Sequence, residues 1–99
     1  MDPYDSFGQT PLHRACSTSS FKAAKVLLQY GAGVNALTDN GETTIMILAG
    51  QKKPSKKFFK LLLDFNAKRD LENKDNMRAV DIARMTNVHK DIIRLLQPV

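Results

Sequence analysis

Apolar residues recur at helical spacing along the chain, in short segments that are separated by polar turns. The first such segment places Leu12, Ala15 and Cys16 on one face. Thr10 and Pro11 precede it. A threonine hydroxyl can accept a hydrogen bond from a free N–H at a helix start, and proline suits the first helical position. The pattern therefore predicts a helix that begins directly after Thr10.

A second helix is predicted over residues 21–30. The polar segment 17–20 separates it from the first helix and has the composition of a cap. Ala24, Leu27 and Leu28 are spaced to form one buried stripe. This pair of helices is expected to pack face to face across a tight turn.

The second helix is followed by turn chemistry. Gly31 is well placed to end the helix in the left-handed conformation. Residues 33–41 contain Asn35, Asn40 and Gly41, which favour turns. One unit is therefore predicted to be helix, tight turn, helix and an extended, hairpin-like loop.

Two motifs repeat in step along the chain. The first reads FGQTPL at 7–12, NGETTI at 40–45 and DNMRAV at 75–80. The second has two apolar residues, a basic residue and two more apolar residues: AAKVL at 23–27, FFKLL at 58–62 and IIRLL at 92–96. Gly8 and Gly41 lie 33 residues apart, and Asn76 takes the glycine position 35 residues later. A period of this length indicates a solenoid of stacked repeats.

The residues resemble those of a known family. GQTPLHRA at 8–15 is similar to the G-x-T-P-L-H-x-A signature of ankyrin repeats, and LLQYGAGVNA at 27–36 is similar to their L-L-x-x-G-A-x-V-N-A ending. The resemblance implies an all-α ankyrin-repeat solenoid with three helix-turn-helix repeats and connecting β-hairpin-like loops. The solenoid is expected to form a single domain over 1–99. Its repeats are expected at 5–37, 38–72 and 73–97, and the last is a C-terminal capping repeat.

The second repeat departs from the family pattern. Thr44 replaces the proline, Met46 replaces the histidine, and about two residues are added near Pro54. In the family, the signature threonine and histidine bond locally and to the neighbouring hairpin, so Met46 is expected to contribute only packing. Proline inside a helix costs about 3 kcal/mol. The first helix of this repeat is therefore expected to end by Lys53, and the second to begin near Ser55.

The third repeat departs in a different way. Arg78 stands where the other repeats have the capping threonine, and Asp81 replaces the signature histidine. Aspartate at that position is often seen in C-terminal ankyrin repeats. The repeat is expected to close the stack.

The resemblance implies a non-catalytic module that binds another protein, as an adaptor, scaffold or regulatory subunit. Ankyrin domains generally contact partners through their hairpin tips and the exposed inner helices. Carried over position by position, the implied partner-binding residues are Ser6, Phe7, Gln9, Asp39, Asn40, Glu42, Lys74, Asp75 and Met77. Ile47 is expected to project towards the groove. The ends of the first helices of each repeat, including Met85, are expected to add to this surface.

Candidate chemistry is sparse. His13 is explained by the repeat signature, and neither it nor His89 has a neighbouring cluster of Cys or acidic residues that would suggest a metal. The lone Cys16 occupies a core position and excludes a disulfide within the chain. The glycines are widely separated and form no phosphate-binding loop. No catalytic residue, metal site, cofactor or small-molecule substrate is predicted.

One asparagine has a candidate modification. Asn35 follows Val34, with Leu27 eight residues earlier. This is similar to the context in which a cytosolic asparaginyl hydroxylase modifies many ankyrin proteins, although Gly33 replaces an acidic residue often found there. The alternative is that Asn35 hydrogen-bonds its own hairpin.

The positive charge of the chain suggests an alternative function. The formal net charge is +5 with a pI near 9.6, and much of it comes from Lys52, Lys53, Lys56 and Lys57. These lysines could contact nucleic acid or an anionic surface. The other interpretation is a solvated loop, because interleaved aromatic residues for base stacking are not evident: Phe58 and Phe59 share the register of the core stripe. The sequence therefore favours a protein partner over nucleic acid.

The location is predicted from the same features. Apolar stretches fall far below the roughly 20 residues needed to span a bilayer, and the N-terminal residues show no apolar signal region. A single cysteine is typical of a reducing compartment. The protein is expected in the cytoplasm, the nucleus or both, as a monomer on its own.

Overall fold

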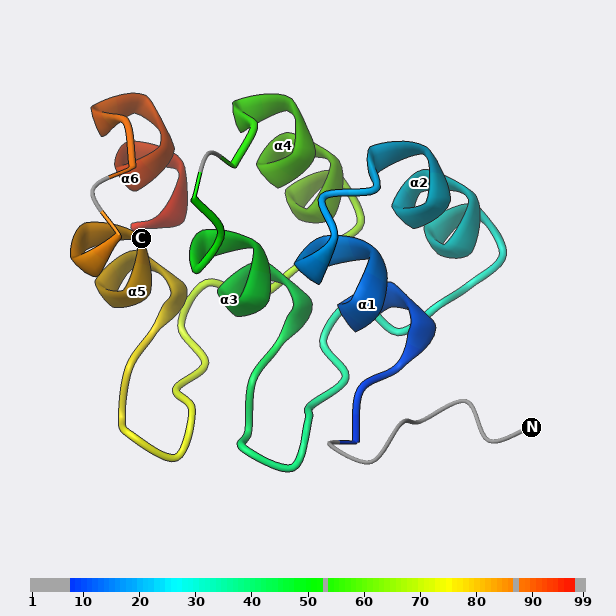
Figure 1. Cartoon of the computed structure of the whole chain (residues 1–99), viewed down its shortest axis with the longest axis horizontal. Coiled ribbons are helices and arrows are strands. Elements are labelled where there is room, and N and C mark those ends of the chain that lie inside the picture. The colour runs from blue at the N-terminus through cyan, green and yellow to red at the C-terminus, as the bar shows by residue number, and fades with distance from the viewer. Residues whose placement is uncertain (1–7, 53, 87, 98–99) are drawn as a thin grey trace.

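A computed structural model describes residues 8–52, 54–86 and 88–97 as three stacked pairs of helices. In chain order the helices are α1 (Pro11–Ser17), α2 (Phe21–Gln29), α3 (Thr44–Ala49), α4 (Lys56–Asp64), α5 (Ala79–Met85) and α6 (Lys90–Leu96). Helices α1, α3 and α5 form one row, α2, α4 and α6 form a second row beside it, and the long loops extend from the first row (Figure 1). The described residues contain no strand, so the predicted all-α solenoid is confirmed.

Neighbouring pairs pack through their inner helices. Helix α3 contacts α1 on one side and α5 on the other, and α4 contacts α6 in the outer row. The rings of Phe21 and Phe58 join α2 to α4 with centroids 5.7 Å apart, in an edge-to-face arrangement. None of the helices in the described ranges has the length and apolar character that crossing a membrane requires.

The first helix starts as its sequence predicts. The Thr10 hydroxyl accepts from the backbone N–H of His13 at 3.2 Å, and Pro11 occupies the first turn. The Thr10 N–H donates to Nδ1 of His13 at 3.0 Å, so Nδ1 is the acceptor of the ring. His13 Nε2 then carries the proton and donates to the carbonyl oxygen of Glu42 at 3.1 Å. One buried histidine thus caps its own helix and holds the next hairpin.

The lysine-rich insertion lies between two helices, as Pro54 predicts. Helix α3 ends at Ala49, and α4 begins at Lys56. Ser55 caps α4, because its hydroxyl accepts from the N–H of Phe58 at 3.2 Å. The extra residues therefore enlarge a turn without breaking a helix.

Repeat two has the most completely buried inner helix. Every residue of α3 is buried, which agrees with the expectation that this repeat depends strongly on apolar contact. The expectation that Met46 contributes only packing is wrong. Its sulfur accepts a weak hydrogen bond from the N–H of Thr43 at 3.5 Å, so the thioether takes over part of the local role of the signature histidine.

The apolar positions of the repeated motifs meet in one interior. In the outer row, Phe58 and Leu62 of α4 are buried, as are Ile92 and Leu96 of α6. Leu27, at the position of Leu62, was expected in the same stripe but is only partly buried. It lies in a groove with Pro11, Arg14, Ala15, Thr18, Ser20 and Ala23, on a side where the described residues hold no further helix pair.

Polar side chains join each repeat to the next. Asn35 was expected, as the alternative to its modification, to bond its own hairpin, and that interpretation is wrong. Its Oδ1 accepts from the N–H of Lys68 at 2.8 Å, and its Nδ2 donates to the carbonyl oxygen of Asn66 at 3.1 Å. Asn35 is thus a clamp between the loops of repeats one and two. Hydroxylation of Asn35 stays a prediction.

Further bonds of this kind use backbone carbonyl oxygens as acceptors. The Thr44 hydroxyl, at the position of the family's proline, donates to Val34 at 2.8 Å. Between repeats two and three, the Thr86 hydroxyl donates to Ala49 at 2.8 Å. The Arg69 guanidinium donates to Leu95 at 2.9 Å. These bonds fix the register between repeats, while apolar burial supplies most of the stabilisation.

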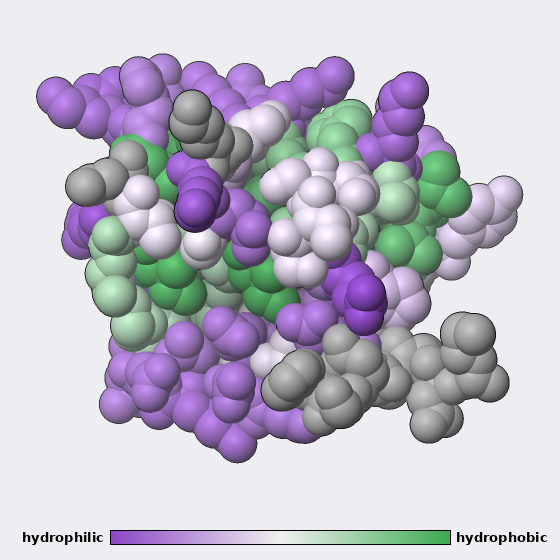
Figure 2. All heavy atoms as spheres, in the orientation of Figure 1, coloured by the Kyte–Doolittle hydropathy of each residue, from purple (hydrophilic) through white to green (hydrophobic). Residues whose placement is uncertain are grey.

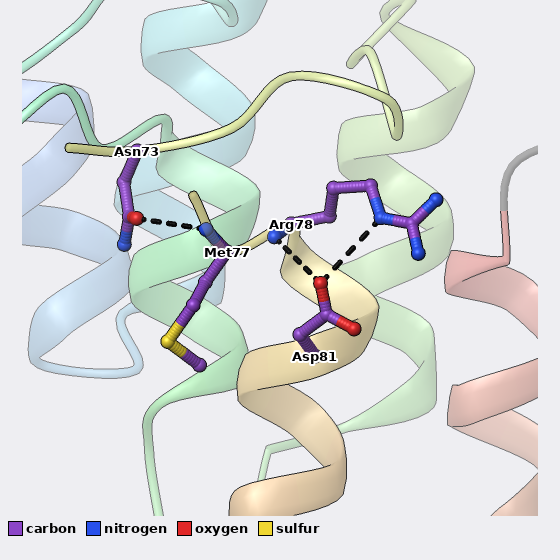
Figure 3. A network of polar contacts seen from close by, with 4 residues as sticks. All are labelled: Asn73, Met77, Arg78 and Asp81. Atoms are coloured by element: carbon purple, nitrogen blue, oxygen red, sulfur yellow. Dashed lines mark hydrogen bonds and ion pairs between the residues drawn. The ribbon is translucent and has the colours of Figure 1, made fainter. Parts of the chain in front are cut away.

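The third repeat replaces the threonine cap with a charged one. The Asp81 carboxylate accepts from the backbone N–H of Arg78 at 3.0 Å and lies 3.5 Å from Nε of the same arginine (Figure 3). The backbone N–H bond, followed by the charge and side-chain bond of Arg78, lowers the pKa of Asp81 below its ordinary value of 3.8, against the opposing effect of partial burial. A carboxylate in the first turn also suits the helix dipole.

Replacing the clamp asparagine tests the polar link between repeats. Asn35→Ala removes both bonds to the neighbouring loop and should lower the free energy of unfolding by about 1 kcal/mol, measured by urea denaturation. Asn40→Ala, on an exposed hairpin tip, is the matched control and should change it by less than about 0.5 kcal/mol. Equal effects of the two substitutions would show that the clamp contributes no stability.

Replacing the charged cap tests its pH dependence. Because the folded-state pKa of Asp81 lies below its ordinary value, its charge adds stability above about pH 4, and this is lost as pH falls through the folded-state pKa. Asp81→Asn should therefore lower the free energy of unfolding at pH 7 by up to about 1 kcal/mol, after solvent screening. Thermal unfolding of both proteins should converge at acidic pH. A difference that persists undiminished there would contradict the charge-based account.

Candidate functional site

Two hairpin tips are held in shape by side chains at equivalent positions. The Thr38 hydroxyl accepts from the N–H groups of Asn40 at 3.3 Å and Glu42 at 3.2 Å. In the next hairpin, Asn73 Oδ1 accepts from the N–H of Met77 at 3.1 Å (Figure 3) and from that of Asp75 at 2.8 Å. Neither role was predicted from the sequence, although Ser, Thr and Asn commonly form such turns.

Each tip turns through a left-handed residue. Gly41 has φ +75°, and Asn76 has φ +60° at the corresponding position. Asparagine tolerates this conformation better than other residues with a Cβ. The substitution of Asn76 for glycine therefore preserves the turn that the repeat requires.

The two tips are bonded to one another. The N–H of Lys74 donates to the carbonyl oxygen of Asn40 at 3.1 Å. A Cβ on Gly41 would lie 3.4 Å from that same Lys74 nitrogen, an ordinary contact, so glycine is favoured here by its positive φ and not by lack of space. The tips of repeats two and three therefore form one continuous edge.

The predicted partner-binding residues lie at different depths. Asp39, Asn40, Lys74 and Asp75 are exposed, while Gln9, Glu42 and Met77 are half-buried. Ser6 and Phe7 lie outside the described residues. The structure thus brings the residues of the second and third hairpins together at one edge. The charged residues of this edge are three acids and one base, Asp39, Glu42, Asp75 and Lys74, which suits a partner with polar groups.

Ile47 differs from its expected placement. It was expected to project into the groove, but only 9% of it is exposed, and it belongs to the buried core. The cause is its register, because Ile47 lies on a helix that packs against inner helices on both sides. Ile47 therefore packs in the core and has little exposed surface that a partner could contact.

The inner row exposes a large apolar side chain at the end of α5. Met85 is 72% exposed, although it ends a helix whose other apolar residues are at least partly buried. The equivalent positions are Ser17 and Gly50 in the other repeats. A large, flexible apolar side chain in solvent is therefore specific to repeat three. Leu37, at the start of the second hairpin, is 53% exposed.

The chemistry of the described residues is consistent with binding. Cys16 is fully buried, and this burial raises its pKa to about 12, so its thiol is protonated at neutral pH. No group of three or more His, Cys, Asp or Glu within residues 8–52, 54–86 and 88–97 could hold a metal ion. The two histidines are engaged in capping: His13 in α1 and His89 in α6.

The lysine segment lies in the turn before α4 and on its first residues. Lys52, Lys56 and Lys57 are exposed, and Lys53 lies outside the described residues. Lys56 is 3.8 Å from Asp91 of α6, and Lys57 Nζ is 4.8 Å from the centroid of the Phe21 ring. Two of these lysines thus have partners on neighbouring helices.

Comparisons with known proteins agree with this architecture. The model of a family described as ankyrin repeats, in three copies, matches residues 1–67. Inversin from Danio rerio is 42% identical over 66 residues, which is 67% of this chain and 6% of that protein. Members of this family generally bind other proteins and are typically non-catalytic. Because the family model matches and the helices form three stacked pairs, the chain belongs to the ankyrin repeat family.

Proposed function

We propose that this chain binds a partner protein through the edge formed by its second and third hairpin tips and the exposed end of α5. The observation that carries this proposal is Met85, which is 72% exposed on the inner helix row. An exposed methionine gives a flexible apolar contact that adapts to a partner's shape. Met85 ends α5 and the third hairpin precedes that helix, so the surface would run along the inner row from the polar tips to this apolar side chain.

The tips support the proposal through their rigidity. Side-chain bonds from Thr38 and Asn73 fix each turn, and the bond from Lys74 to Asn40 joins the two turns. A surface that is already ordered loses little conformational entropy on binding. The edge is thus suited to recognition by a partner that docks without reshaping it.

An adaptor or regulatory role in the cytoplasm or nucleus accompanies this proposal. It is supported by the presence of Cys16 as a buried thiol and by family membership. The alternative function, binding of nucleic acid or an anionic surface by Lys52, Lys53, Lys56 and Lys57, has less support. Lys56 and Lys57 already contact Asp91 and Phe21, and the ring face of Phe21 is occupied by the lysine.

A charge placed on the exposed methionine tests the proposed surface. Met85→Glu should reduce recovery of partner proteins captured from cells by at least about fivefold, because it puts a carboxylate into an apolar contact worth more than about 1 kcal/mol. Quantitative mass spectrometry of the captured proteins gives the readout, and circular dichroism checks the helix content.

Tyr30→Glu is the matched control, because Tyr30 is also highly exposed but ends α2 in the outer row. It should leave capture by the inner face unchanged. If Met85→Glu captures the same partners at the same level while remaining folded, the proposed surface is wrong.

A further inference from the structure

The positive charge of the chain is concentrated on one face. Helices α2, α4 and α6 together contain seven Lys or Arg residues and two Asp residues. This difference equals the net charge of +5 for the entire chain, so all other residues taken together are formally neutral. Hydrophilic residues accordingly gather over the outer helices along the upper edge of Figure 2. The basic residues, all exposed, are Lys22, Lys25, Lys56, Lys57, Lys60, Lys90 and Arg94.

The centre of the second repeated motif carries one base in each outer helix. Lys25, Lys60 and Arg94 occupy the same position of AAKVL, FFKLL and IIRLL. The helices that carry them stand side by side (Figure 1). The repeat therefore builds a row of cations on the outer face, opposite to the proposed hairpin edge.

A cleft opens within this row, between α2 and α4. Its volume is about 510 Å³, within the range of sites that hold small molecules or short peptide segments. Its lining combines basic side chains with two apolar ones and a single acid: Lys25, Lys56, Lys57, Lys60, Phe21, Leu61 and Asp64.

The floor of the cleft is apolar and fixed in place. Phe21 packs edge-on against the buried Phe58, with ring centroids 5.7 Å apart. Lys57 Nζ lies 4.8 Å from the centroid of Phe21, which is within range of a cation–π contact. Leu61 is half-buried beside the core. The cleft therefore offers a small hydrophobic base beneath a rim of ammonium groups.

The rim has an excess of positive charge within the fold. Lys56 and Lys57 lie in the first turn of α4, which contains no acidic residue, so they oppose the helix dipole. Lys56 and Lys60 lie four residues apart on the same helix, and like charges at this spacing repel. Two acids offset part of this charge: Asp91 lies 3.8 Å from Lys56, and Asp64, which also lines the cleft, follows Lys60 by four residues. An anionic ligand at the rim would relieve this repulsion.

We propose that the cleft between α2 and α4 is a second binding site, for an acidic peptide segment that carries an apolar side chain. The apolar side chain would rest on Phe21 and Leu61, and flanking carboxylates would pair with Lys25 and Lys60. Lys57 covers one face of the Phe21 ring, where a base of nucleic acid would stack, so the apolar side chain of the peptide would contact Leu61 and the uncovered part of Phe21. A flat membrane would contact the rim without reaching the recessed floor. This site does not depend on the proposed hairpin surface.

Fluorescence anisotropy with the whole chain tests the site. The probe is a short fluorescein-labelled peptide of glutamates with one central phenylalanine. Lys25→Gln combined with Lys60→Gln should weaken its binding roughly tenfold, because each removes an exposed charge pair. Lys68→Gln combined with Arg84→Gln is the matched control. It removes the same charge from exposed positions outside the cleft and should weaken binding by less than about threefold.

A second peptide and two competitors decide the nature of the ligand. Replacing the central phenylalanine of the probe with serine should weaken binding severalfold, since the floor would lose its contact. Equal binding of the two peptides would overturn the proposal in favour of a generic polyanion. So would equally tight binding of a DNA oligonucleotide or of phosphatidylserine vesicles. Equal effects of the two double variants would also overturn it.

A variant of the inner face separates this site from the hairpin surface. Met85→Glu should bind the acidic peptide as the unaltered chain does, because Met85 lies in the inner row. A parallel loss of peptide binding in Met85→Glu would show that the peptide occupies the hairpin edge, and it would overturn the second site while leaving the proposed function standing.

Discussion

Every part of this structure depends on the burial of one repeat against the next. A single pair of short helices has too little interior to cover its own apolar face. Helix α3 shows the solution, since all six of its residues are buried between α1 and α5. The same constraint explains Leu27, whose counterparts in the next repeats are buried against a preceding helix pair and which itself remains partly exposed. Stacking of the repeats forms the buried core, and the surfaces that stay exposed are available for binding.

Hydrogen bonds then give this apolar stack a single register. Burial alone would tolerate small slips of one helix pair along another, but His13, Asn35 and Thr86 each bond a defined backbone group in a neighbouring repeat. Such bonds contribute modestly to stability and strongly to geometry. The hairpin tips connect helices that these bonds hold in register, so the positions of the tips are fixed as well. The residues proposed to bind a partner lie on irregular loops, yet these bonds hold them in defined positions.

The sequence predicted the elements well, because their signals are local. Thr10 and Pro11 mark a helix start, Pro54 marks a turn, and the repeated motifs mark the core. Some misses are local, such as the bond from the Thr43 N–H to the Met46 sulfur, and the others concern contacts between repeats. The bonds of Asn35 to the neighbouring loop, and the burial of Ile47, depend on residues about one repeat away that no local pattern reveals. The basic row on the outer helices was present in the motif, but its meaning required knowing which helix faces stand side by side.

The burial of α3 on both sides also determines the order in which the repeats unfold. In a linear stack, each repeat is held only by its neighbours, so the middle repeat has two stabilising interfaces and each end repeat has one. Opening can then begin at either end at a modest cost, whereas opening of the centre requires loss of the whole structure. We therefore expect the slowest amide exchange of the described residues in the inner helix of repeat two, and the earliest cleavage by a protease in the first and last of the described helix pairs.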